Sequence, residues 1–326
     1  MELDARVARY LERAARSGLG VRDVASLSGD ASDRSYYRIV TDGGARVLAL
    51  LPQPFDPGTL PFLNVARLFE AIPVRVPRVD DVSGEDGILL LEDAGDELLQ
   101  VVPSSERPPL YREAVEIVAR IQRRGAELAS PSFIPYGVVF DEEKLTWELE
   151  YFRKHFLEGL AGARLSPQER DRLKPWWARL ASDLSRRPRV LCHRDYHSRN
   201  LMRHDGGLVV LDFQDARLGP RTYDLVSLLS DSYVALDAEL VRDMKRYYAE
   251  LAGIAAADLE EEYGPMALQR NLKALGTFGY QIGVRGKEVY RPHVPHTLAL
   301  VRANLDRHPE WDALRLLLAA HLPELS

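Results

Sequence analysis

The sequence has 326 residues, of which 46% are hydrophobic and 28% are charged, so the chain is long enough to bury one large core or two smaller ones. Its formal net charge of −6 arises from interspersed acidic and basic residues, which gives no basic surface for nucleic acid or for an anionic membrane. The N-terminus lacks a secretion signal and no apolar run is long enough to cross a membrane, so we expect a globular cytoplasmic protein.

The N-terminal region is expected to form a helix followed by a β-hairpin. Apolar residues at helical spacing favour a helix over residues 3–17, which glycines end. Two strand-like runs follow, 24–27 and 36–40, separated by a loop of small residues. Such a loop can bind nucleotide phosphates through backbone N–H groups and hydroxyls, although most loops of this composition bind nothing. The candidate phosphate ligands in this loop are Gly29, Ser32 and Ser35.

A third strand is expected over residues 46–51, at the position where nucleotide kinases usually carry a phosphate-binding lysine. This run contains no lysine. The candidate replacements are Arg34, Arg38 and Arg46, and the sequence does not choose among them. Residues 87–95 predict a buried strand that runs into a loop, which in a two-lobed kinase would be the hinge.

The remainder of the chain is expected to be almost wholly helical. Three prolines within residues 103–109 indicate a domain boundary. Thr222 is expected to cap a helix that begins near Tyr223 and that also contains Asp231 and Tyr233. A loop followed by a helix is predicted over 57–71. The other predicted helices span residues 111–124, 141–160, 167–187, 238–251, 259–283 and 296–322. Glycines at 276, 279 and 283 indicate close packing or a bend in one of them.

The densest chemical pattern lies between these helices. His193, Arg194 and Asp195 are followed five residues later by Asn200, and an apolar run over 208–211 leads to Asp212. This is the spacing of a phosphoryl-transfer loop, with one carboxylate for the attacking hydroxyl and with an amide and a second carboxylate for magnesium. The β-like run indicates a short hairpin that returns Asp212 to the loop.

Two simpler interpretations compete with this one. An isolated match of this kind is also explained by turn and cap residues. His193 and His197 have the spacing of zinc ligands on a helix, but no third ligand is obvious. The single cysteine, Cys192, lies in an apolar run, which predicts a buried thiol and excludes an intramolecular disulfide.

The motifs of this region resemble those of the aminoglycoside phosphotransferase and choline kinase family. The similar segments are HRDYHSRN over 193–200, DFQDA over 212–216, TYDLVSLL over 222–229, and a distal segment over 269–278. Within that family the chain is most similar to bacterial kinases of cell-wall recycling. Those enzymes use ATP to phosphorylate the 1-hydroxyl of N-acetylmuramate and N-acetylglucosamine.

The resemblance implies an α+β, bilobal protein-kinase-like fold. Residues 1–102 would form a small β-rich lobe with a hinge near 91–95, and residues 103–326 a larger helical lobe. ATP and Mg²⁺ would be the cofactors and a small amino sugar the partner. The oligomeric state stays open.

The resemblance also implies a role for each motif residue. Asp195 would orient and deprotonate the sugar hydroxyl, Asn200 and Asp212 would hold Mg²⁺, and His193 and Asp224 would brace the loop. Backbone groups of Glu92 and Ala94 would hold adenine. Candidate substrate ligands are Glu148, Glu150, Asp215 and Asp231, which would also suit a cationic alcohol.

Two other functions remain open from the sequence. One is a kinase of another alcohol, such as an aminoglycoside, choline or a different sugar. The other is a nucleotide-binding pseudokinase, which the missing lysine favours and the intact Asp195, Asn200 and Asp212 oppose. The absence of an A-P-E motif after Asp212 disfavours a peptide substrate.

Overall fold

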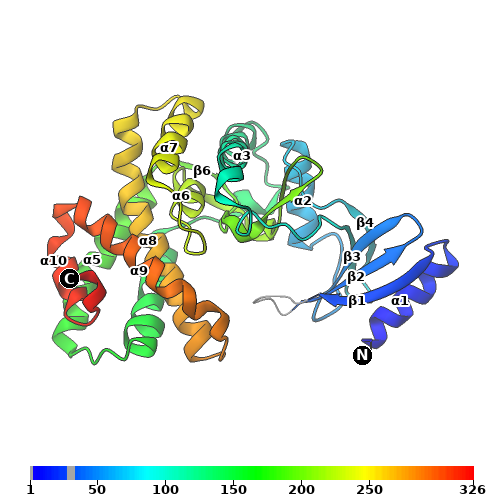
Figure 1. Cartoon of the computed structure of the whole chain (residues 1–326), viewed down its shortest axis with the longest axis horizontal. Helices are drawn as coiled ribbons and strands as arrows, with labels where there is room; N and C mark the ends of the chain where they lie inside the picture. The colour runs from blue at the N-terminus through cyan, green and yellow to red at the C-terminus, as the bar shows by residue number, and fades with distance from the viewer. Residues whose placement is uncertain (1–2, 28–33) are drawn as a thin grey trace. The chain divides into compact units, whose positions relative to one another are not determined.

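The computed structural model describes residues 3–27 and 34–326, which form two compact units (Figure 1). Unit 1 contains residues 1–97 and 202–214, and unit 2 contains residues 98–201 and 215–326. The chain therefore passes from unit 1 to unit 2, returns for one short segment, and ends in unit 2.

Unit 1 is built on a five-stranded antiparallel sheet in the order β1-β2-β3-β5-β4. Its strands are β1 (Val21–Leu27), β2 (Ser35–Thr41), β3 (Gly44–Leu50), β4 (Val79–Ser83) and β5 (Ile88–Glu92). β1 and β2 pair from Leu27 opposite Tyr36 onward, which confirms the predicted hairpin. The sequence analysis did not predict β4, because two aspartates in a five-residue edge strand hide the apolar pattern.

Helix α1 (Ala5–Arg16) packs on this sheet. Its first turn is capped by Asp4, whose carboxylate accepts the Arg6 N–H at 2.8 Å. Val7 and Tyr10 belong to one buried cluster with strand residues such as Leu48. The helix predicted over 3–17 is confirmed, with its apolar stripe facing the core.

The returning segment of unit 1 packs beside helix α2 (Pro61–Ala71). Strands β7 (Leu201–His204) and β8 (Gly207–Val210) form a hairpin. Its two turn residues, Asp205 and Gly206, have positive φ angles of 47° and 78°, as a tight hairpin turn requires. After β8, the ring of Phe213 lies 4.7 Å from that of Phe62 and 5.7 Å from that of Phe69.

Unit 2 is mostly helical. Its helices are α3 (Arg107–Glu127), α4 (Glu142–Tyr151) continued by a π-helix (Phe152–Leu160), α5 (Pro167–Arg186), α6 (Tyr223–Leu229), α7 (Ala238–Ala252), α8 (Ala256–Gly283), α9 (Val294–Arg307) and α10 (Asp312–Ala319). Strands β6 (Arg189–Cys192) and β9 (Arg217–Pro220) form an antiparallel pair. Cys192 at the end of β6 is fully buried, as predicted, and burial raises the pKa of its thiol.

Three helix predictions need correction. Helix α6 ends at Leu229, so Asp231 and Tyr233 lie beyond it. Thr222 has φ of −85° and ψ of −5°, close to helical values, and its side chain makes no capping hydrogen bond, because a capping side chain normally requires an extended backbone at this position. The helix predicted over 296–322 is two helices, α9 and α10, since a 3₁₀ turn over Pro309–Trp311 interrupts it.

Helix α8 approaches the π-helix closely, as the glycine pattern predicted. A Cβ atom at Gly276 would lie 2.8 Å from the backbone nitrogen of Phe152, and one at Gly279 would collide with the His155 carbonyl. Only glycine permits this backbone approach. No helix in the described part of the chain is both long enough and apolar enough to cross a membrane.

Candidate active site

The loop after β6 is held in a strained backbone conformation. Arg194 has φ of 88°, in the left-handed region that residues other than glycine rarely adopt. The carboxylate of Asp224, in the first turn of α6, accepts the backbone N–H groups of His193 at 2.6 Å and of Arg194 at 3.0 Å. These two bonds from a fully buried carboxylate stabilise the strained conformation.

Two further contacts fix the loop. Asp231 accepts the backbone N–H of Ser198 on one oxygen and that of Tyr233 on the other, both at 2.8 Å. The Tyr196 hydroxyl donates to the Ala114 carbonyl of α3 at 3.0 Å. The loop is thus bound to three neighbouring segments of unit 2, and Asp195 projects from a rigid support.

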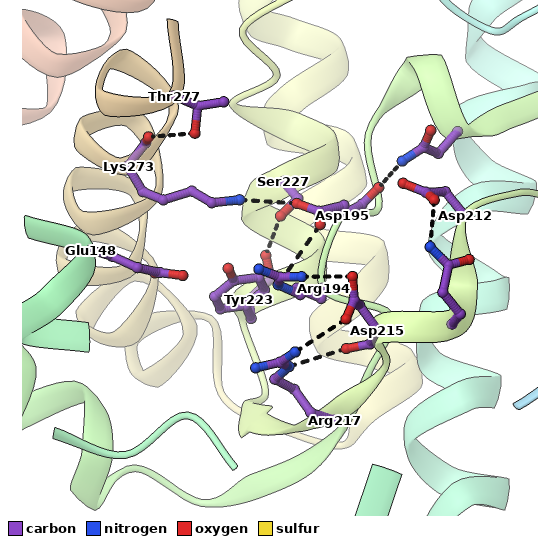
Figure 2. A network of polar contacts seen from close by, with 12 residues as sticks. Glu148, Arg194, Asp195, Asp212, Asp215, Arg217, Tyr223, Ser227, Lys273 and Thr277 are labelled. Atoms are coloured by element: carbon purple, nitrogen blue, oxygen red, sulfur yellow. Dashed lines mark hydrogen bonds and ion pairs between the residues drawn. The ribbon is translucent and has the colours of Figure 1, made fainter. Parts of the chain in front are cut away.

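Three cations lie near the carboxylate of Asp195, and Figure 2 shows two of them, Lys273 and Arg194. Lys273 of α8 donates from Nζ to Oδ1 at 3.0 Å, and a guanidinium nitrogen of Arg270 lies 3.8 Å from the same oxygen. Arg194 Nε lies 3.8 Å from Oδ2. Burial alone would raise the pKa of Asp195, but Lys273, Arg194 and Arg270 together hold this pKa well below its usual range. At neutral pH the carboxylate is therefore ionised and accepts hydrogen bonds.

A polar network supports these cations (Figure 2). Arg194 pairs with Asp215 at 2.9 Å, and Arg217 lies 3.5 Å from the same carboxylate. Arg270 Nε donates to the Ser227 hydroxyl at 2.8 Å. Each cation thus has a fixed partner in unit 2.

The two predicted magnesium ligands lie in different units. In unit 2, the Asn200 side-chain N–H donates to the Asp195 carbonyl at 2.8 Å, so the amide is oriented and its oxygen is directed elsewhere. In unit 1, Asp212 is exposed, has φ of 57°, and accepts the Gln214 side-chain N–H at 2.7 Å.

The chemistry of this donor set fits Mg²⁺. An amide oxygen and an exposed carboxylate are hard ligands of the type that Mg²⁺ prefers. Across the described residues, no group of three or more His, Cys, Asp or Glu side chains is arranged to hold a metal ion. A magnesium ion that took either group as a ligand would need further oxygens from nucleotide phosphates and water, as is usual for this ion.

The predicted nucleotide ligands lie in unit 1. Glu92 ends β5, and its backbone N–H already donates to the Arg78 carbonyl at 2.8 Å. Ala94 follows it and is buried, while Ser35 begins β2 and is exposed. Gly29 and Ser32 lie outside the described residues.

Two of the candidate phosphate-binding arginines are engaged with acids of unit 1. Arg38 pairs with Asp93 at 2.6 Å and with Asp96 at 2.9 Å, and Arg46 pairs with Asp80. Both guanidinium groups therefore have carboxylate partners, which a phosphate would have to displace or share.

The four candidate substrate acids have different surroundings. Glu148 is 2% exposed and accepts the Gln269 side-chain N–H at 2.7 Å. Glu150 pairs with Arg153 at 2.7 Å, and Asp215 is half exposed beside Arg194. Both oxygens of Asp231 accept backbone N–H groups, a geometry that braces the loop.

The sequence analysis assigned no role to the basic residues of α8. It noted the segment that contains Arg270 and Lys273 only as part of the resemblance. A signal was present in the sequence, because two cations three residues apart in a helix with many apolar residues need a carboxylate partner if they are buried. Which carboxylate they find depends on contacts between residues 78 positions apart, and these require the fold.

The family model described as "phosphotransferase enzyme family" matches residues 23–263. The N-acetylmuramate/N-acetylglucosamine kinase of Neisseria meningitidis is 31% identical over 308 residues, covering 91% of this chain and 90% of that protein. The enzyme of the same name from Pseudomonas aeruginosa is 33% identical over 307 residues, covering 91% and 88%.

Solved structures with similar folds have far lower identity. The ADP-bound aminoglycoside phosphotransferase APH(2'')-Ib has a TM-score of 0.63 at 16% identity, covering 91% of this chain and 98% of that one. Choline kinase LicA from Streptococcus pneumoniae has a TM-score of 0.57 at 14% identity, covering 90% and 100%. These likenesses confirm the predicted α+β kinase-like fold.

Proposed function

Because this chain belongs to the phosphotransferase enzyme family, we propose that it uses ATP to phosphorylate the anomeric hydroxyl of an N-acetylated amino sugar, N-acetylmuramate or N-acetylglucosamine. The similarity to kinases of these sugars over about nine tenths of both chains carries the proposal. Since ATP is a cytoplasmic substrate, we place the reaction in the cytoplasm and in peptidoglycan recycling.

Asp195 is the group that acts on the sugar hydroxyl. Its ionised carboxylate accepts the hydroxyl hydrogen bond and directs an oxygen lone pair at the γ-phosphorus. As the new P–O bond forms and the bond to the departing ADP breaks, the hydroxyl becomes acidic and its proton passes to Asp195. A weakly basic carboxylate suits such late transfer. His193 and Asp224 keep the loop in position.

Asn200 and Asp212 are the proposed ligands of Mg²⁺. When bound, the ion neutralises charge on the β- and γ-phosphates of ATP. Asn200 also ties the metal ligand set to Asp195, because its amide donates to the Asp195 carbonyl. A single backbone segment thereby supplies both the hydroxyl acceptor and a metal ligand.

Residues 1–102 are the proposed nucleotide-binding lobe, with a hinge near 91–95, and residues 103–326 the lobe with the catalytic loop and the substrate site. Adenine would contact backbone groups of Glu92 and Ala94. The phosphates would contact Gly29, Ser32 and Ser35. Glu148, Glu150 and Asp215 remain proposed substrate ligands, whereas the contacts of Asp231 favour a bracing role.

A substrate panel followed by phosphorus NMR tests this function. The panel contains N-acetylmuramate, N-acetylglucosamine, glucose, choline and an aminoglycoside, with ADP release as the measurement. We expect turnover with the N-acetylated sugars and a product whose phosphorus couples to the C1 proton. Turnover confined to choline or the aminoglycoside, or a 6-phosphate product, would contradict the proposal. ATP binding without transfer to any of these alcohols would instead favour a pseudokinase.

A further inference from the structure

We propose that Lys273 of α8 is a positioning residue for Asp195, which binds carboxylate oxygen Oδ1 and leaves Oδ2 to accept the substrate hydroxyl. The inference rests on the proposed phosphoryl transfer. It extends that function by adding a residue from a distant helix and by distinguishing the two oxygens of the acceptor.

The contacts of the two oxygens are unequal. Oδ1 accepts a hydrogen bond from Lys273 at 3.0 Å and has Arg270 at 3.8 Å. Oδ2 has Arg194 Nε at 3.8 Å, which is beyond hydrogen-bond length. Arg194 Nε is itself buried without a hydrogen-bond partner among the described residues. One oxygen is thus bonded within the protein, while the other retains its capacity to accept.

Helix α8 holds Lys273 in a fixed register. Three consecutive side chains near Lys273 are bonded to other helices or to their ends. Gln269 donates to Glu148 at 2.7 Å, Arg270 to the Ser227 hydroxyl at 2.8 Å, and Asn271 to the Ser230 carbonyl at 3.0 Å. The segment 269–271 therefore contacts both α4 and the C-terminal end of α6, and rotation of α8 would break all three bonds.

The close approach of α8 to the π-helix adds a second restraint. Gly276 lies one turn beyond Lys273, against the backbone of Phe152. A rare π-helix at this contact is typical of functional sites. The Lys273 side chain is only 16% exposed, so water competes little with Asp195 for its ammonium group.

An oriented carboxylate has a direct chemical advantage. A free aspartate side chain rotates about its last torsion and presents either oxygen in many directions. Bonding one oxygen to Lys273 limits this rotation, so that the other oxygen meets the attacking hydroxyl in one geometry. A purely structural ion pair would contribute to stability without this effect on turnover.

The first test compares Lys273→Met with Lys273→Arg. We expect Lys273→Met to lower kcat by about 10- to 100-fold, as expected when a reacting group loses its orientation, with KM for ATP and sugar changing less than about threefold. Lys273→Arg should recover part of kcat, because a guanidinium donates to the same oxygen. An exposed pair of similar length, Lys174 with Asp171 at 2.8 Å, supplies the control variant Lys174→Met. Unchanged kcat in Lys273→Met would overturn the proposal.

A double-mutant cycle with Asp195→Asn separates positioning from a general effect on folding. If Lys273 acts through Asp195, Lys273→Met should cause no further loss of kcat once Asp195 is asparagine. Multiplied losses would show an independent action and contradict the inference. The double variant also removes the carboxylate that Lys273→Met leaves without its hydrogen-bonded cation, so it should fold even where Lys273→Met alone does not.

The cycle is run with whichever acceptor the wild-type protein phosphorylates. If the wild type transfers phosphate to no N-acetylated sugar, the proposed function fails, and the Lys273 test still proceeds on the active acceptor. If the wild type is active and Lys273→Met equals it, only the positioning inference fails.

Discussion

Asp195 combines two properties that are usually opposed, a side chain that is only 22% exposed and an ionised carboxylate. Burial favours the neutral acid, and the three cations around this carboxylate reverse that preference. In the proposed reaction, these properties suit Asp195 to the role of an orienting acceptor rather than that of a strong base. The same residue is the most informative single position at which to test the chemistry.

Replacement of Asp195 by asparagine keeps the shape of the side chain and removes its charge. We expect kcat to fall by about 10²- to 10⁴-fold, the usual contribution of a group that accepts a proton from the attacking atom. ATP affinity, measured by calorimetry in the presence of Mg²⁺, should change little because Asp195 is not a proposed nucleotide ligand. Asp171→Asn, on the exposed face of α5, is the control. Near-normal turnover in Asp195→Asn would exclude the proposed mechanism.

At the scale of elements, helix α5 begins with a capping box that also anchors the C-terminal segment. The Ser166 hydroxyl accepts the Glu169 N–H at 3.2 Å, and the Glu169 carboxylate accepts the Ser166 N–H at 2.7 Å. The other Glu169 oxygen lies 2.9 Å from His321 Nε2. One glutamate thus joins the start of α5 to the residues that follow α10.

This glutamate predicts a pH-dependent contribution to stability. Hydrogen bonds from the Ser166 N–H and hydroxyl, together with His321, lower the pKa of Glu169 from its ordinary 4.5 to about 2. A folded-state pKa below the unfolded one stabilises the protein above pH 4.5, and this contribution is lost as the pH falls towards 2. Glu169→Gln should therefore lower Tm at pH 7, with a difference from wild type that shrinks below pH 4.5.

Thermal unfolding followed by circular dichroism at several pH values measures this difference. The control variant is Glu143→Gln, an exposed acid in the first turn of α4. A Tm difference that is independent of pH would show that Glu169 contributes through its shape and not through its charge.

Elements with a strong local pattern were predictable from the sequence. Helix α1, the β1–β2 hairpin and helix α8 follow from apolar spacing and small residues, and the structure confirms them. Strand β4 was missed because it lies at the sheet edge and contains Asp80 and Asp81, so its pairing partner decides its structure.

The candidate site likewise contains residues that a local sequence pattern predicts and contacts that depend on the fold. Asp195 and its loop were predictable because their spacing is local in sequence. The resemblance implied that Asp224 braces the loop, whereas the contacts of Asp231 and Lys273 were not predicted, since each joins segments more than 30 residues apart. Local patterns thus predict candidate residues such as Asp195, and the fold shows which distant groups contact them.

At the scale of the whole molecule, the chain crosses between its two units three times, and residues 202–214 complete unit 1. Phe213 is fully buried and contacts the rings of Phe62 and Phe69, while the Val210 N–H donates to the Arg75 carbonyl at 2.8 Å. The N-terminal segment alone lacks these contacts. A cut of the chain near residue 100 would therefore separate unit 1 from part of its own core.

We predict that Phe213→Ala destabilises the intact protein by about 3–5 kcal/mol, the usual effect of removing a buried phenylalanine ring. Urea unfolding, followed by circular dichroism, measures the change. Leu316→Ala is the control, because this side chain is 66% exposed.

By the same reasoning, a fragment of residues 1–97 should remain largely unfolded, whereas the same fragment joined to residues 202–214 by a flexible linker should show cooperative unfolding. Cooperative unfolding of the shorter fragment would mean that unit 1 does not depend on its returning segment.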